Sequence, residues 1–153
     1  MLALDLGTKL GWALLRADGR VESGRVDFTP RRAEGEGMRF LKFRAWLHEI
    51  KRRIEAAGEA LVMVRYEVVN FIMEGQAYAA HVWGALWGHL LAWCEHHGIA
   101  YRGFQPATIK KAATGSGRAS KPEVAAAMRQ RGYPSATSDE ADALALLLIP
   151  VTA

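Results

Sequence analysis

Four carboxylates in this chain have neighbours that make them candidates for metal-assisted chemistry. Asp5 lies inside an apolar run, LALDL, which ends at a Gly-Thr turn. A buried carboxylate is costly unless a cation or a hydrogen-bond donor compensates for it, so Asp5 requires a partner from elsewhere in the chain. Glu67 comes directly after another apolar stretch, and Asp139 and Asp142 stand three residues apart in TSDEADALALLL. That spacing places both aspartates on one face of a helix.

The four carboxylates converge if the helix that bears Asp139 and Asp142 crosses the sheet near the ends of the first and fourth strands. Such a cluster would raise the pKa values of its own members by mutual repulsion, and divalent cations relieve that repulsion. Oxygen ligands of this kind suit Mg²⁺ or Mn²⁺. The single cysteine, Cys94, has no suitably spaced partner for zinc, and its apolar helical surroundings indicate a packed side chain and not a nucleophile.

Each acid also has an ordinary structural interpretation. Asp139 and Glu140 would occupy the first turn of a helix, where acids interact favourably with the helix dipole, and Thr137 with Glu140 fits a capping box. Glu67 could be a solvated residue at the end of a strand. Asp142 lies deeper in its helix, where the dipole effect fades. Asp5 is the hardest of the four to explain in this way.

A basic segment supplies the second half of the chemistry. Between Arg102 and Arg131, seven basic residues accompany one acid, so this segment carries +6 in a chain of net charge +4 and the remainder carries −2. The excess favours an anionic partner such as nucleic acid, with a solvated basic face as the alternative. In SGRASKPEVAAAM, Ser120 and Glu123 form a capping box that places Lys121 at the positive end of a helix dipole. A cation there makes sense if a phosphate binds beside the Gly-Ser-Gly backbone; a solvated lysine is the alternative.

The hydrophobic pattern indicates one mixed α/β domain over residues 1–153, in which a three-strand meander is followed by helices that alternate with further strands. Apolar periodicity and turn residues predict strands at 2–6, 10–16, 20–28, 61–66 and 99–104 and helices at 35–57, 74–97, 121–131 and 138–149. A loop that holds TGSG is expected between the last strand and the helix at 121–131.

The helix at 74–97 carries Gly84 and Gly88 on one stripe, beside Trp83 and Trp87. Each glycine costs about 1 kcal/mol of helix propensity, which makes sense where another backbone approaches closely. That backbone belongs either to the chain's own sheet or to a second copy of the helix across a dimer interface. The sequence has no apolar stretch long enough to span a membrane and no apparent signal peptide, so we expect a cytoplasmic protein without a membrane partner.

Four segments together resemble the RuvC-like Holliday-junction resolvases, and they occur in the same order and with the same separations: MLALDLGTKLGWALL, YEVVNF, IKKAATGSGRASK and SDEADALALLL. The resemblance covers nearly the whole chain, and IKKAATGSGRASK is its most specific part. It is closest to the compact RuvC-like resolvases of phages. It implies an RNase H-like fold, a homodimer, and cleavage of four-way and other branched DNA with Mg²⁺ or Mn²⁺ in a bacterial or phage-infected bacterial cell.

The resemblance also implies roles for individual residues. The metal ligands and catalytic acids, which would hold two Mg²⁺ ions per active site, are Asp5, Glu67, Asp139 and Asp142. Lys121 would act with them by offsetting charge on the scissile phosphate. The residues implied to bind DNA are Lys110, Lys111, Arg118, Lys121 and Phe71. Phe71 is the candidate for the family's aromatic near the junction centre, one position later than in the bacterial pattern.

The resulting hypothesis is two-metal hydrolysis of phosphodiester bonds, with ions about 3.5–4 Å apart and products that carry 5′-phosphate and 3′-hydroxyl ends. A symmetric dimer would cut two opposed strands of the junction. One alternative is a branched-DNA or RNA-directed nuclease of the same fold; the DLGT turn is similar to that of YqgF-like ribosomal RNA nucleases, although the TGSGRASK block argues against them. Another is a junction-binding protein without catalysis, against which the presence of all four acids argues.

Overall fold

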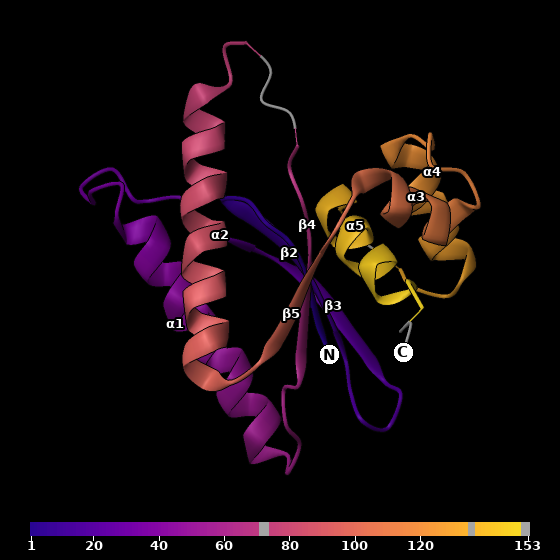
Figure 1. Ribbon diagram of the computed structural model, residues 1–153, viewed down its shortest axis with the longest axis horizontal. Coiled ribbons are helices and arrows are strands. Elements are labelled where there is room, and N and C mark those ends of the chain that lie inside the picture. The colour runs from indigo at the N-terminus through magenta and orange to yellow at the C-terminus, as the bar shows by residue number, and fades with distance from the viewer. Residues whose placement is uncertain (71–73, 135–136, 151–153) are drawn as a thin grey trace.

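The computed structural model describes residues 1–70, 74–134 and 137–150, which form one five-stranded sheet with helices on both faces (Figure 1). The strands are β1 (Leu2–Asp5), β2 (Lys9–Leu15), β3 (Val21–Asp27), β4 (Met63–Glu67) and β5 (Ala100–Phe104). The helices are α1 (Met38–Ala56), α2 (Ala77–His97), α3 (Pro106–Thr114), α4 (Lys121–Gln130) and α5 (Ser138–Leu147). Within these ranges, no helix combines the length and the apolar character that a membrane span requires.

The strand order is β3-β2-β1-β4-β5. The first three strands pair antiparallel, and β4 and β5 continue the sheet in parallel from β1. The predicted mixed sheet of three antiparallel strands followed by parallel ones is therefore confirmed. The expected helices at 35–57 and 74–97 are also present, but each begins about one turn later than predicted, at Met38 and Ala77.

Helix α3 is the element that the sequence prediction missed, because a loop was expected there. Pro106 occupies its first turn, and Gly115, with φ of 84°, ends it in the left-handed conformation that favours glycine. Only Ile109 and Ala113 are buried along it. One apolar pair four residues apart is too short a pattern to stand out beside a glycine-containing loop.

Alternation along the strands separates large from small side chains. On β1, Leu2 and Leu4 join the apolar core under α1 and α2, whereas Ala3 belongs to the core under α3, α4 and α5. Ala13 on β2 faces the same side as Ala3. Figure 1 shows the two helical layers on opposite faces of the sheet. Small residues on the second face let α5 lie close to the strands.

The closest approach is at Gly11 on β2. A Cβ atom at this position would lie 1.9 Å from the backbone carbonyl oxygen of Asp139. The first turn of α5 therefore rests directly on the backbone of β2, and Gly11 is the residue that permits it.

The other end of α5 is held by Arg65 of β4. Its Nη1 donates hydrogen bonds to the carbonyl oxygens of Leu146 at 2.8 Å and Ile149 at 2.6 Å, and only 4% of the residue is exposed. A cation is favourable at a helix C-terminus, where carbonyl groups lack partners. Since Arg65 stands two residues before Glu67, this contact ties α5 to the strand that carries a predicted catalytic acid.

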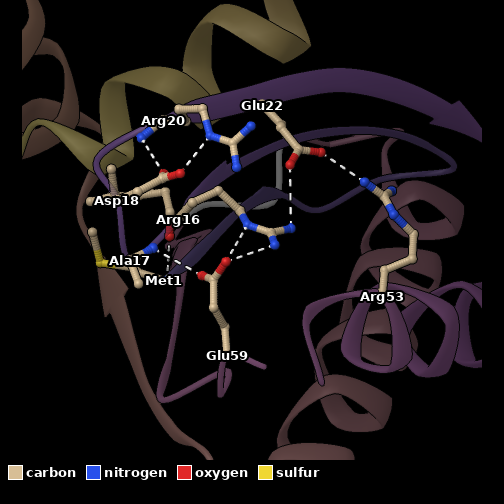
Figure 2. Close-up of polar contacts among 9 residues, drawn as sticks. Met1, Arg16, Ala17, Asp18, Arg20, Glu22, Arg53 and Glu59 are labelled. Atoms are coloured by element: carbon tan, nitrogen blue, oxygen red, sulfur yellow. Dashed lines mark hydrogen bonds and ion pairs between the residues drawn. The ribbon is translucent and has the colours of Figure 1, made fainter. Parts of the chain in front are cut away.

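Ion pairs link the elements at the end of the sheet that lies away from Asp5 and Glu67 (Figure 2). Arg16 contacts Glu22 at 3.3 Å and Glu59 at 2.7 Å, and Arg53 of α1 reaches Glu22 at 2.7 Å. These contacts join the β2–β3 hairpin to α1 and to the segment before β4. They leave the end of the sheet at Asp5 and Glu67 free of this network.

Candidate active site

Asp5 and Glu67 lie side by side because they end neighbouring parallel strands. Leu4 of β1 pairs with Tyr66 of β4, so the residue that follows each of them is an acid at the same edge of the sheet. Alternation turns both acids to the face that α5 covers. Asp5 also pairs with Gly11, on which the first turn of α5 rests. The first turn of α5 thus lies beside Asp5 at the end of β1, and Asp142, farther along the helix, acts on both Asp5 and Glu67.

The first turn of α5 has contacts of its own on β3. Thr137 caps the helix by accepting a hydrogen bond from the Glu140 backbone N–H at 3.2 Å. The buried Glu140 carboxylate accepts a hydrogen bond from Ser23 Oγ at 2.6 Å. Asp139 forms an ion pair with Arg25, whose Nε lies 3.2 Å from Asp139 Oδ2. The Thr137 hydrogen bond of the expected capping box is therefore confirmed, and Asp139 and Glu140 also fix the helix to β3.

The Asp5 carboxylate is poorly compensated. Burial raises its pKa to about 8, and repulsion from Asp142, Glu67 and Asp139 adds to this, while Lys121 opposes it. Within the described ranges, no residue donates a hydrogen bond to it. Asp5 is thus the group in this site with the greatest need for a bound cation.

The pKa values of the neighbouring acids Glu67 and Asp142 are also raised. Burial, followed by the charge of Asp142, raises the pKa of Glu67, although Lys121 and Lys110 act against the rise. Burial is also the main reason that the pKa of Asp142 is raised. These mutual effects place Asp5, Glu67 and Asp142 near one another, with Asp139 acting on Asp5 and Asp142.

Two lysines come to this site from the basic segment. Lys121 begins α4, and its Nζ lies 3.5 Å from Asp142 Oδ2. Partial burial lowers the pKa of Lys121, but the carboxylates, with Asp142 first, raise it above its usual value. The predicted capping box of Ser120 and Glu123, which lie on either side of Lys121 in the sequence, is confirmed in both of its hydrogen bonds. Lys110 lies on α3 and acts on Glu67 and Asp142, so the helix that the sequence prediction missed is the element that positions it.

No protein-family model and no curated protein matches the chain. Solved structures do match it: RuvC of T. thermophilus in complex with a Holliday junction substrate aligns with a TM-score of 0.73 over 97% of this chain and 90% of that one, at 24% sequence identity. The chain has the RuvC fold. A second Thermus thermophilus RuvC structure gives a TM-score of 0.70 at 24% identity, over 97% of this chain and 92% of that one. The yeast mitochondrial Holliday junction resolvase Ydc2 gives 0.58 at 13% identity, over 96% and 75%. The predicted RuvC-like, RNase H-like architecture is confirmed, and the phage-type assignment stays a prediction.

The donors that this RuvC fold gathers suit a hard divalent cation in type. All are carboxylates, and burial together with the nearby Asp142, Glu67 and Asp139 raises the pKa of Asp5 to about 8, so a bound cation would favour its ionised form. Among the described residues, however, no three Asp, Glu, His or Cys side chains lie close enough together to hold one metal ion. Arg25 engages Asp139, and Lys121 engages Asp142. Metal binding therefore requires these carboxylates to turn from protein cations to the ion.

The remaining predicted residues are distributed differently. Lys111 on α3 and Arg118 in the α3–α4 connection are exposed, and nothing in the described ranges brings them to the acids. Phe71 lies outside the described residues. Burial raises the pKa of Cys94 to about 12, which confirms that it is a packed side chain. Arg25 was missed, and no sequence signal marks it, because its link to Asp139 exists only in the folded chain.

Proposed function

We propose that this chain is a metal-dependent endonuclease that resolves four-way DNA junctions by paired nicks. The observation that carries the proposal is the gathering of Asp5, Glu67, Asp139 and Asp142 at one edge of the sheet, with Lys121 beside them. The substrate class is supported by the likeness to RuvC bound to a Holliday junction and to a yeast Holliday junction resolvase.

The four acids would hold two Mg²⁺ ions, for which Mn²⁺ can substitute. Ions held in this way would supply an activated water and stabilise the leaving 3′-oxygen, chemistry that gives 5′-phosphate products. Lys121 would neutralise charge on the scissile phosphate, because its ammonium group already lies 3.5 Å from Asp142. Lys110 would bind the adjoining DNA backbone from α3, with Lys111 and Arg118 as exposed contacts farther out.

The test is a cleavage panel with the wild-type protein. A four-way junction, a flap, a linear duplex and an RNA–DNA hybrid compete in one reaction, with Mg²⁺, Mn²⁺ or EDTA. We expect the junction to be cut first, by symmetric nicks with ligatable ends, and only with a divalent ion. Preference for the hybrid would favour the RNA-directed alternative. Junction binding without cutting under any metal would favour a binding protein without catalysis.

We further propose that the chain acts as a homodimer through α2. A Cβ atom on Gly84 or Gly88 would meet none of the described residues within 4 Å, so packing against that part of the chain explains neither glycine. Beside them the rings of Trp83 and Trp87 stack at 5.7 Å, and Trp87 is 38% exposed. This favours the second of the two interpretations of the glycine stripe, a close approach by another copy. Two copies would present one active site to each of two opposed strands.

Gly84→Leu is expected to convert the dimer to a monomer, because a large side chain would hold the two helices apart. The variant monomer itself should be about 0.8 kcal/mol more stable, since leucine has the higher helix propensity. Light scattering gives the mass, and urea denaturation gives the stability. Ala56→Leu, which adds leucine to an exposed position on α1, is the control and should keep the wild-type mass. A dimeric Gly84→Leu protein would contradict this interface.

A further inference from the structure

The edge strand β3 carries a basic side chain at the border of the site. Arg25 pairs in register with Gly11, and Gly11 pairs on its other side with Asp5. Arg25 thus stands two strands from Asp5, which is about 10 Å across the sheet. Ser23, two residues earlier on the same face, contacts Glu140 of α5. Arg25 therefore projects on the side of the sheet that carries the acids.

The guanidinium group of Arg25 is only partly used by the protein. Its Nε lies 3.2 Å from Asp139 Oδ2, and 35% of the side chain is exposed. In the part of the chain that the structure describes, it has no other ion pair or hydrogen bond. A guanidinium group has five N–H donors, so most of those on Arg25 remain available to a ligand.

The known cations of the site lie on its other side. Lys110 and Lys121 come from α3 and α4 and act on Glu67 and Asp142. Arg25 comes from the opposite edge of the sheet and contacts Asp139. A DNA strand carries a phosphate at every nucleotide, so a strand whose scissile phosphate lies among the acids continues past the site in both directions. With such a strand bound, the lysines would face its phosphates on one side of the site and Arg25 those on the other.

The geometry points to Arg25 as a residue that binds a DNA phosphate next to the scissile one, on the side away from Lys110 and Lys121. The inference rests on the proposed function. Arginine suits this task because its planar fork pairs with two phosphate oxygens at once. The contact with Asp139 holds the guanidinium group at the border of the site before DNA arrives.

Arg25→Gln should weaken binding of a four-way junction in EDTA, where no cleavage occurs. The slope of log K against log salt should fall by about 0.9 for each Arg25 engaged, or about 1.8 for a dimer that uses both. Arg25→Lys keeps the charge and should retain most of the slope. The control is Arg52→Gln, which makes the same charge change away from the site. Arg52 lies on the exposed side of α1, where it is paired with Glu49. It should leave the slope unchanged.

A junction with a neutral methylphosphonate at one position identifies the phosphate. Placed next to the cleavage site on the Arg25 side, it should lower wild-type affinity and have no further effect on Arg25→Gln. A wild-type slope in Arg25→Gln, or an equal effect of the methylphosphonate on both proteins, would overturn the inference while leaving the proposed function intact. A wild-type protein that fails to bind the junction would overturn the proposed function, and this inference with it.

Discussion

Asp5→Asn is expected to abolish junction cleavage and, at the same time, to make the metal-free protein more stable. The amide has nearly the shape of the carboxylate but removes a charge that Asp142, Glu67 and Asp139 all repel. Under the proposed function it would also remove a metal ligand. Bound metal contributes several kcal/mol of transition-state stabilisation, so we expect a loss in cleavage rate of about a thousandfold or more.

The gain in stability should depend on pH in a defined direction. The pKa of Asp5 is about 8 in the folded protein, against 3.8 ordinarily, so the folded state holds this proton more tightly than the unfolded state. The contribution of Asp5 to the free energy of unfolding is therefore complete below about pH 4 and is lost as the pH rises toward 8. At about 1.4 kcal/mol for each unit of pKa, a shift of this size corresponds to a loss of about 6 kcal/mol. Wild type and Asp5→Asn should match near pH 4, and the variant should be the more stable at pH 8.

Urea denaturation in EDTA across this pH range measures the effect, and added Mg²⁺ should reduce the wild-type deficit. The matched control is Asp18→Asn, in the exposed β2–β3 turn. Hydrogen bonds from the Arg20 backbone and side chain hold the pKa of Asp18 below its usual value, so this variant should gain no stability at pH 8. Normal cleavage by Asp5→Asn would refute the catalytic assignment. An Asp5→Asn protein less stable than wild type at pH 8 would refute the electrostatic account.

Gly11→Ala is expected to destabilise the protein strongly, whereas Asp5→Asn stabilises it. The added Cβ would lie 1.9 Å from the Asp139 carbonyl oxygen and 2.8 Å from the Glu140 backbone nitrogen. Both are backbone atoms of a helix that Arg65 holds at its other end, so the first turn of α5 must move away from β2. Overpacking of this severity costs about 3 kcal/mol or more. Because Asp139 and Asp142 move with the turn, cleavage should fall as well.

Thermal or urea unfolding measures the cost, and the cleavage assay measures the displacement of the acids. Gly37→Ala is the control, since a Cβ there meets no atom of residues 1–70, 74–134 or 137–150 within 4 Å and its φ of −61° is ordinary for alanine. It should change stability by less than about 1 kcal/mol. Wild-type stability in Gly11→Ala would show that α5 does not rest on this strand.

The parts of the fold that could be predicted are those in which local pattern and tertiary position agree. The apolar run around Asp5 and the strand end at Glu67 place both acids correctly, because alternation and strand ends follow from sequence alone. The pairing of Arg25 with Asp139 could not be predicted, since it depends on the angle at which α5 crosses the sheet. Helix α3 was missed because its buried face is only two residues long.

The outer layer of α3 and α4 packs mainly on α5 and on itself, with α5 between it and the strands. Its exposed surface includes Lys111 and Arg118, whose side chains contribute little to the packing of the core. Under the proposed function, substitutions there would alter binding of the nucleic-acid backbone while the acids stay in place. In the proposed nuclease, the outer contacts of Lys111 and Arg118 can therefore change over evolutionary time without moving the four acids, which lie on the sheet and on α5.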